Sequence, residues 1–446
     1  MKRIFLFLLA LGLVLSAAAS AEEGRADFAV SMIEALAAGK YDTVEAASDP
    51  ALIQAVAQSG GYASVWAQIT SALGTFVECT GAEDSGDAVL VYCDFAQTGA
   101  VLSVGVTQEM RLSGLILSDL LPQEDAEDVQ EDGSYVEEDV IFRSGEEDET
   151  GATLTFPKGD GPFPAVLLVP GSGAADRDAS AYGLTPFRDL ARGLARRGIA
   201  SIRYDKYSYA HPELLQADCT IEREYLIDTR AALEALLSDS RVSRVFVLGH
   251  SQGAMLGPRI LGDLLPHADG RLAGGILLAG TPKHLWEIQY RQNLDLLDLT
   301  EKAYSSEQLA EMGVDLNAQR AQLEAEVQKI DRLETEETFF GLPASYQADE
   351  MRVDAAQAAI ENGLPLWIGQ GAKDWQVLPE EGLEAWKGAL AGSDLDVSYH
   401  LYPDMNHLLI DMEGEPTYSV EDYLVPGAHV DENLIEDLAT WISSVA

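Results

Sequence analysis

A short turn-forming motif, Gly-His-Ser-Gln-Gly centred on Ser251, constrains the fold of this chain more than any other stretch. It directly follows the apolar, β-branched run 242–248, and the segment 254–265 after it is compatible with a helix. Because Gly249 and Gly253 lack a Cβ, a strand and a helix can approach each other closely at a sharp turn. The order strand, turn, helix predicts that the Ser251 hydroxyl is exposed above the edge of a sheet.

The pattern around this motif predicts an α/β domain. Strand patterns occur at 136–143, 152–156, 163–170, 198–204, 242–248, 275–278, 364–371 and 396–402, and helical spacing occurs at 186–197, 221–237, 254–265, 379–390 and 432–442. Strands that alternate with helices form a mainly parallel sheet with helices on both faces. We therefore expect such a sheet in the domain at 138–446.

The motif and the alternation resemble the α/β-hydrolase superfamily over about residues 136–446. A serine hydroxyl is a poor nucleophile unless a histidine base and an orienting acid activate it. In this superfamily the acid and then the histidine follow the serine, each at the carboxyl end of a later strand. Asp374 follows the strand pattern at 364–371, and His407 follows the next one. The resemblance implies Ser251 as nucleophile, His407 as base and Asp374 as acid.

Other histidines and acids near these positions are weaker candidates. His400 lies within a predicted strand, and His429 opens the last predicted helix, where a capping or surface role is expected. Asp404 and Asp411 are close to the proposed base, but neither ends a strand of its own; Asp404 is the alternative acid. His250 is adjacent to the nucleophile, and adjacent side chains point apart at such a turn. We expect His250 to pack or to form a hydrogen bond.

Negative charge that develops on the substrate carbonyl oxygen requires two backbone N–H donors. One is the amide after the nucleophile, that of Gln252. The loop 170–178, Pro-Gly-Ser-Gly-Ala-Ala-Asp-Arg-Asp, resembles the His-Gly-x-Gly loop of the superfamily, and by position the amide of Ser172 is the second donor. Pro170 stands where the superfamily usually has histidine, so a side chain that supports the loop is missing.

Two charged motifs lie close to this loop in the predicted sheet. Asp-Arg-Asp at 176–178 ends the loop itself, and Tyr-Asp-Lys-Tyr at 204–207 ends the following strand. We interpret both as structural, with ion pairs that stabilise the loop; contact with substrate is the alternative.

The alternation of strands and helices stops at 284–361, where a helix-rich and strongly charged segment intervenes. Members of the superfamily carry a lid over the active site after the sixth strand, and this segment has the same place. The resemblance implies a lid. A helical surface excursion without contact to substrate is the alternative.

Residues 22–117 predict a separate domain. Apolar residues recur at intervals of three and four through 26–57 and 62–73, which predicts helices, and β-like runs follow. Helices followed by a small antiparallel sheet indicate an independent α+β domain, and its outline resembles the NTF2-like domains found ahead of secreted hydrolases. It contains no histidine, so we assign it no chemistry; it binds a ligand, forms a homodimer or positions the enzyme. The acidic stretch 118–137 predicts a linker or an exposed loop.

Cys79 and Cys93 fall in two β-like runs on either side of the turn-rich segment 81–87. In a hairpin the two would face each other, and outside the cytoplasm this favours a disulfide. Two reduced, buried thiols are the alternative. Cys219 has no histidine arrangement around it that indicates catalysis, and we expect it to pack.

The first 21 residues have the three parts of a secretory signal: Lys2 and Arg3, an apolar run at 4–15, and small residues ending at Ala21. The run is shorter than the roughly 20 residues that a membrane span needs, so we expect extracellular or periplasmic export without a stable membrane anchor. The formal net charge of −45 repels phosphate backbones, so nucleic acid is not an expected partner.

These features predict a secreted serine hydrolase, a carboxylesterase that cleaves a small-molecule acyl ester through an acyl-enzyme. A serine peptidase of the prolyl or aminopeptidase type is one alternative, and a binding protein without turnover on the same fold is another. A free-amine substrate requires carboxylates under the lid, where Glu334, Glu336 and Glu337 are candidates. The sequence has no metal-ligand cluster and no dinucleotide-binding loop, so it implies no cofactor and no metal.

Overall fold

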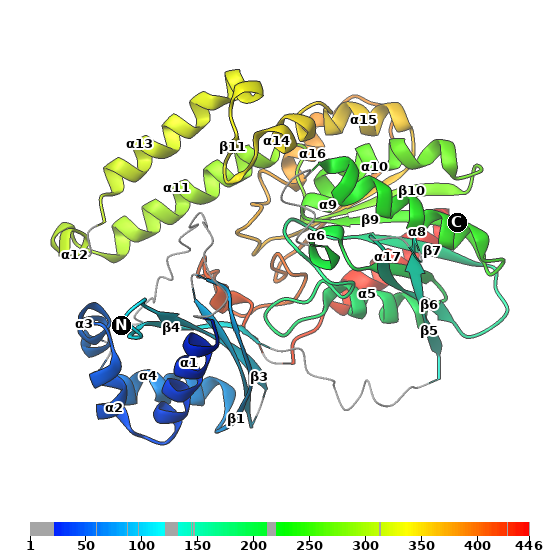
Figure 1. Cartoon of the computed structure of the whole chain (residues 1–446). Helices are drawn as coiled ribbons and strands as arrows, with labels where there is room; N and C mark the ends of the chain where they lie inside the picture. The colour runs from blue at the N-terminus through cyan, green and yellow to red at the C-terminus, as the bar shows by residue number, and fades with distance from the viewer. Residues whose placement is uncertain are drawn as a thin grey trace.

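The computed structural model describes residues 22–58, 60–86, 88–96, 98–120, 133–143, 145, 148–211, 220–311, 314–425 and 427–445. The proposed signal segment, most of the acidic stretch and Cys219 lie outside the described residues. The chain forms a smaller N-terminal region and a larger α/β region (Figure 1). No helix within these ranges combines the length and the apolar character needed to cross a membrane.

An eight-stranded sheet with the order β14-β13-β10-β9-β7-β8-β6-β5 forms the centre of the larger region. β6 pairs antiparallel with both β5 and β8, and every other pairing in the sheet is parallel. The mainly parallel sheet predicted from the alternation is confirmed. Its strands are β5 (Tyr135–Phe142), β6 (Thr150–Pro157), β7 (Phe163–Val169), β8 (Ala200–Tyr204), β9 (Val242–His250), β10 (Leu272–Leu278), β13 (Leu366–Gly371) and β14 (Val397–Tyr402).

Both faces of this sheet are apolar, which explains why its central strands read as continuous hydrophobic runs. Along β9, Val245 and Val247 contribute to one core while Phe246 and Leu248 contribute to the other, since neighbouring side chains on a strand point to opposite faces. The first core is covered by α8 (Ile227–Ser238), α10 (Gly257–Leu264) and α16 (Leu383–Ala389), and the second by α5 (Pro186–Ala195) and α17 (Glu432–Val445). Short helical turns are α6 (Tyr207–Ala210), η1 (Glu222–Leu226), α9 (Gln252–Met255), η2 (Leu265–His267) and η4 (Val420–Asp422).

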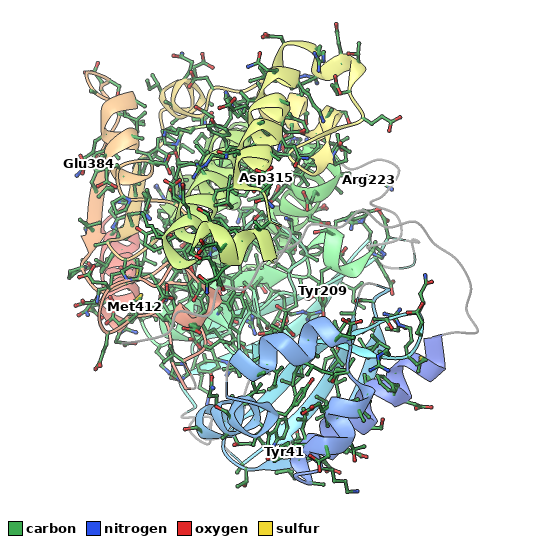
Figure 2. All side chains as sticks on the ribbon, turned by 90° about the vertical axis from the view of Figure 1, so that its left-hand side faces the viewer. Tyr41, Tyr209, Arg223, Asp315, Glu384 and Met412 are labelled. Atoms are coloured by element: carbon green, nitrogen blue, oxygen red, sulfur yellow. The ribbon has the colours of Figure 1, made fainter. Side chains whose placement is uncertain are left out.

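A helical segment is inserted between β10 and β13. It comprises α11 (Leu285–Ala303), α12 (Ser306–Glu311), α13 (Leu316–Val327), η3 (Gln328–Thr335), β11 (Thr338–Phe339), β12 (Leu342–Pro343), α14 (Ala344–Glu350) and α15 (Ala355–Asn362). α11 and α13 run side by side as an arm that extends from the sheet (Figure 1). Seen end-on, this arm, which contains Asp315, lies over the N-terminal region, which contains Tyr41 (Figure 2). α15 instead packs on α10, where Asn362 donates to the Pro258 carbonyl at 2.7 Å.

The N-terminal region is an α+β unit with its own core, as the sequence predicted. Trp66, Phe76 and Phe95 pack together inside it, with ring centroids 5.6 to 6.1 Å apart. Its antiparallel sheet has the order β1-β2-β3-β4. The elements are α1 (Glu22–Ala37), α2 (Tyr41–Ala47), α3 (Pro50–Gln58), α4 (Tyr62–Leu73), β1 (Phe76–Asp84), β2 (Val89–Phe95), β3 (Gly99–Val106) and β4 (Leu112–Leu120).

Cys79 and Cys93 face each other as register partners on β1 and β2. Their sulfur atoms lie 3.7 Å apart and both are free thiols. The predicted disulfide is therefore wrong for this structure, because an S–S bond is only about 2.05 Å long. The neighbouring Cys79 thiol and burial both raise the pKa of Cys93, which keeps this sulfur protonated.

The two regions also touch directly. Leu424, from the C-terminal part of the chain, packs against the core of the N-terminal region. The end of β4 approaches the loop after β7 so closely that a Cβ at Gly183 would lie 2.8 Å from the Leu120 Cβ. The backbone of Tyr182 hydrogen-bonds to the Asp119 carboxylate, whose pKa is raised by burial. The sequence reasoning that predicted a linker at 118–137 did not identify these contacts.

Candidate active site

Ser251 occupies a strained turn at the end of β9, with φ 54° and ψ −119°. The flanking glycines are needed there because of close backbone approach. A Cβ at Gly249 would lie 2.2 Å from the Gly253 carbonyl oxygen, and a Cβ at Gly253 would lie 2.5 Å from the Val169 carbonyl oxygen. Because both glycines lack a Cβ, the turn can pack closely against β7, and the Ser251 side chain lies at the sheet edge.

The structure brings Ser251, His407 and Asp374 together in one hydrogen-bonded chain. His407 Nε2 lies 3.0 Å from Ser251 Oγ, and His407 Nδ1 lies 2.8 Å from Asp374 Oδ2. Asp374 follows β13 and His407 follows β14, so the three residues come from the carboxyl ends of β9, β13 and β14, with β10 between β9 and β13 in the sheet. Since Nδ1–H donates to the carboxylate, Nε2 is left to accept a proton from the serine hydroxyl.

Uncharged donors fix the Asp374 carboxylate, which is only 1% exposed. Its Oδ1 accepts from the backbone amides of Gln376 and Val377, both at 2.9 Å. Its Oδ2 accepts from Gln370 Nε2 at 2.8 Å in addition to His407. Sequence reasoning missed Gln370. The available signal was a polar residue at the buried end of an otherwise apolar strand, β13.

His250 supports the base and stays neutral. Its Nε2–H donates to the backbone carbonyl of His407 at 2.7 Å, and the two rings lie 5.0 Å apart. Burial, reinforced by the neighbouring His407, lowers the pKa of His250 to about 3. The predicted packing and hydrogen-bonding role is confirmed.

The two expected oxyanion donors, the amides of Ser172 and Gln252, belong to segments that meet at the nucleophile. Gly171 lies so close to it that a Cβ there would be 3.1 Å from the Ser251 Cβ. Within the part of the chain that the structure describes, neither amide donates a hydrogen bond to another protein group. Both N–H groups are therefore free to bind a substrate oxygen.

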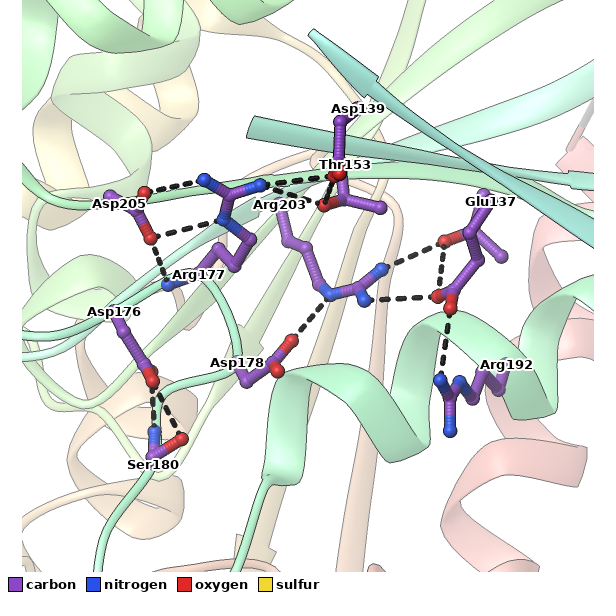
Figure 3. A network of polar contacts seen from close by, with 11 residues as sticks. Glu137, Asp139, Thr153, Asp176, Arg177, Asp178, Ser180, Arg192, Arg203 and Asp205 are labelled. Carbon is purple, nitrogen blue, oxygen red and sulfur yellow. Dashed lines mark hydrogen bonds and ion pairs between the residues drawn. The ribbon is translucent and has the colours of Figure 1, made fainter. Parts of the chain in front are cut away.

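Ion pairs tie the oxyanion loop to the sheet (Figure 3). Arg177 pairs with Asp205 at 2.6 Å, and Asp178 pairs with Arg203 at 2.7 Å. Asp176 accepts from the backbone and hydroxyl of Ser180. Each charge of the Asp-Arg-Asp motif thus has a partner within the protein, in agreement with its structural interpretation.

The rival residues are engaged elsewhere. Asp404 pairs with Lys373 at 2.8 Å and its side chain is 62% exposed. His400 stacks on Trp367 with centroids 4.4 Å apart, and His429 pairs with Asp189 at 3.2 Å. None of these three contacts involves Ser251, whereas His407 and Asp374 are hydrogen-bonded in line with it.

The structural interpretation of the Tyr-Asp-Lys-Tyr motif agrees with its ion pairs, but sequence reasoning missed the buried polar cluster that its lysine forms beneath the oxyanion loop. Lys206, from the Tyr-Asp-Lys-Tyr motif, is fully buried with Glu224 and Tyr225 around it, and Tyr346 reaches the same cluster from α14. No local pattern reveals it, because its members are far apart in the chain. Among the residues that the structure describes, no group of three or more His, Cys, Asp or Glu is arranged to hold a metal ion.

A sheet of this order, with a serine, an acid and a histidine at the carboxyl ends of its strands, defines an α/β-hydrolase fold, and the chain is a serine hydrolase. It belongs to the family described as serine aminopeptidase, S33, whose model matches residues 184–415, just over half of the chain.

Esterase EstD of Thermotoga maritima is 29% identical over 384 residues, which cover 85% of this chain and 86% of EstD. Among solved structures, the Pyrococcus furiosus esterase Pf2001 is similar with a TM-score of 0.43 and 14% identity over 73% of this chain and 96% of that one. Est1E from Butyrivibrio proteoclasticus has a TM-score of 0.41 and 14% identity over 69% of this chain and 99% of that one.

Proposed function

We propose that this serine hydrolase is a carboxylesterase that cleaves small acyl esters through Ser251, His407 and Asp374. The observation that carries the proposal is the continuous hydrogen-bonded chain from Ser251 Oγ through His407 to Asp374. Similarity to an esterase along 85% of the chain supports an ester as the substrate.

In the first half of the reaction, Ser251 Oγ attacks the ester carbonyl carbon while His407 Nε2 takes the hydroxyl proton. Asp374 stabilises the imidazolium that forms. The oxyanion accepts hydrogen bonds from the Ser172 and Gln252 amides. When the carbonyl re-forms, the bond to the alcohol oxygen breaks and His407 Nε2 gives its proton to that oxygen. The alcohol leaves, and the acyl group stays on Ser251.

In the second half, water attacks the acyl carbon and gives a proton to His407 Nε2. The new tetrahedral intermediate uses the same two amides. It collapses to release the carboxylic acid, and His407 returns the proton to Ser251 Oγ. Both halves begin with a neutral His407 whose proton is on Nδ1 and bonded to Asp374, so that Nε2 can accept the incoming proton.

We assign the inserted segment at 284–361 as the lid. Its α14 reaches the nucleophile turn, where Gln252 Nε2 donates to Tyr346 Oη at 3.0 Å. A closing element that contacts the turn excludes water from the acyl-enzyme until the alcohol has left. The protein acts after export directed by the signal at 1–21, which N-terminal sequencing of the mature protein tests.

An aminopeptidase is the second candidate, because the family that the chain matches is described by that activity. The acids expected to bind a free amine do not favour it. Glu336 pairs with Arg332 at 2.6 Å, and Glu334 and Glu337 are exposed on the surface.

The deciding experiment compares p-nitrophenyl esters of graded chain length with aminoacyl p-nitroanilides, together with a fluorophosphonate probe. We expect ester turnover to exceed anilide turnover, labelling at Ser251, and loss of both turnover and labelling in Ser251→Ala. Faster cleavage of the anilides would establish the peptidase instead. A label on a different serine would contradict the assignment of the nucleophile.

A further inference from the structure

The Lys206 ammonium lies directly beneath the oxyanion loop and is completely buried. Its Nζ donates to the Gly171 carbonyl at 2.8 Å and to the Gly173 carbonyl at 3.0 Å. Glu224 Oε1 at 2.9 Å balances its charge, and Tyr225 Oη lies at 2.8 Å. Two of its contacts are thus carbonyls of the loop that carries Ser172.

These groups belong to a closed ring of hydrogen bonds. Tyr225 Oη contacts the Gly171 carbonyl at 2.8 Å and Gln252 Oε1 at 3.0 Å. Gln252 Nε2 donates to Tyr346 Oη, which donates to Glu224 Oε2 at 2.6 Å, and Glu224 closes the ring at Lys206. All five side chains of the ring are at most 5% exposed. The ring joins both oxyanion segments and α14 through one buried ion pair.

The geometry of the peptide bond connects this ring to the direction of the Ser172 N–H. The Gly171 carbonyl and the Ser172 N–H belong to one planar peptide unit, and in a trans peptide the two groups point in opposite directions. Lys206 and Tyr225 both bind that carbonyl from below. The Ser172 N–H must therefore point away from them, toward the side of the loop where substrate binds.

Stability alone does not require an ion pair here. Taking two charges out of water is costly, and well-packed apolar residues of similar volume are often as stabilising as a buried pair. What apolar side chains cannot do is hold two loop carbonyls in a fixed direction. The superfamily usually has a histidine beside this loop, and Pro170 stands in its place.

We propose that Lys206 is the positioning residue of the oxyanion hole: through Gly171 and Gly173, and together with Tyr225, it aims the Ser172 amide at the substrate oxygen. The inference rests on the proposed function. It acts on the transition state more than on substrate binding, because the oxyanion forms only after attack. Tyr346 extends the same ring to the lid.

The test uses a double variant, Lys206→Met with Glu224→Gln, because removing one charge alone would leave the other buried and unpaired. Loss of an oxyanion donor costs about 10²- to 10³-fold in kcat, and we expect a fall of that size with KM changed less than about threefold. Affinity for an aryl boronic acid, which forms a tetrahedral adduct on the serine, should fall by a similar factor. Arg241→Met is the matched control, since it removes an ion-paired cation at the amino end of β9.

Tyr225→Phe removes the hydroxyl that contacts the Gly171 carbonyl, Lys206 and Gln252 but keeps the ion pair, and it should lower kcat by about tenfold. It decides the question if the double variant does not fold. Unchanged kcat in a folded variant, or a fall in kcat with unchanged boronate affinity, would overturn the inference. The fluorophosphonate labelling rate separates the two proposals. An unlabelled wild-type Ser251 contradicts the proposed function, whereas equal labelling of wild type and variants contradicts only the role of Lys206.

Discussion

The two halves of the proposed active site are held in place by different kinds of contact. On the acid and histidine side, Asp374 is fixed by Gln370 and two backbone amides, and His407 is held by the neutral His250. On the oxyanion side, two loop carbonyls accept hydrogen bonds from the buried ammonium of Lys206, which is paired with the Glu224 carboxylate. One half is fixed by neutral groups and the other by an ion pair.

The difference follows from the charge that each half must handle. Because the donors around Asp374 other than His407 are uncharged, its negative charge remains available to stabilise the imidazolium. A cation paired with Asp374 would compete with that imidazolium. The oxyanion loop does not stabilise an imidazolium, so an ammonium can bind its carbonyls without competing with His407.

The largest expected effect comes from changing the charge on the neutral side. Asp374→Asn keeps the shape of the side chain but favours the wrong histidine tautomer, and we expect kcat on p-nitrophenyl acetate to fall about 10⁴-fold. Asp404→Asn is the matched control and should retain activity close to that of the wild type, since Asp404 is exposed and pairs with Lys373. A greater loss in the control would transfer the role of acid to Asp404.

The same contrast explains what could be predicted from the sequence. Ser251, Asp374 and His407 could be predicted because the resemblance to the superfamily implies their chain order and their places at strand ends, and parallel strands bring their carboxyl ends to one edge. The neutral side is also local in sequence, since Asp374 and the backbone amides that bind it lie within 374–377. The ring around Lys206 joins the chain near 206, 224, 252 and 346, and only the folded chain brings these positions together.

Two other differences between expectation and structure have physical causes. A hairpin places Cys79 opposite Cys93 but does not by itself oxidise them, and their sulfurs stay 3.7 Å apart. The acidic linker indicated two domains but not which residues they bring into contact, because acidity says nothing about tertiary packing. Leu424 packs on the N-terminal core from a position more than 300 residues away in the chain.

The next prediction concerns the neutrality of His250. Its folded-state pKa of about 3 lies below the ordinary value of 6.5, so the unfolded chain binds the additional proton between these values. The stability contribution is fully present above pH 6.5 and is lost as pH falls from there toward 3. The free energy of unfolding should therefore drop by about 2 kcal/mol between pH 7 and pH 5 from this group alone.

His250→Gln keeps an N–H donor and removes the titration. Chemical denaturation of wild type and variant at both pH values measures the difference, because the other titrating groups are common to the two proteins. The wild type should lose about 2 kcal/mol more than the variant. Equal losses would show that folding does not lower the pKa of His250.

A smaller effect is expected from Gln370→Leu, which leaves Asp374 with its backbone donors and His407. A hydrogen bond to a charged group contributes about 1.5 kcal/mol or slightly more, and we expect kcat to fall by about tenfold with KM little changed. Gln357→Leu, at a solvent-exposed hydrogen bond on α15, is the control for loss of an amide. If kcat stays at the wild-type value, the two backbone amides suffice to fix the carboxylate.

The smallest expected effect comes from removing the N-terminal region, since every residue of both halves lies in the larger α/β region. The predicted boundary at 138 falls inside β5, so the truncation that keeps the whole sheet begins at residue 133. We expect residues 133–446 to fold and to hydrolyse a short p-nitrophenyl ester with kcat/KM reduced less than about tenfold. We still expect a moderate reduction of kcat/KM, because Leu424 packs on the N-terminal core. Its neighbour Tyr423 stacks on Trp375, the residue after Asp374, with ring centroids 5.9 Å apart. The comparison requires a soluble, folded truncation measured beside the full mature chain. The truncation carries Leu424→Ser, because removal of the N-terminal region would expose the apolar Leu424 side chain to water. An inactive but folded truncation would show that the N-terminal region is needed to hold Asp374 and His407 in place. Activity on larger substrates would then distinguish a role of this region in binding from a structural one.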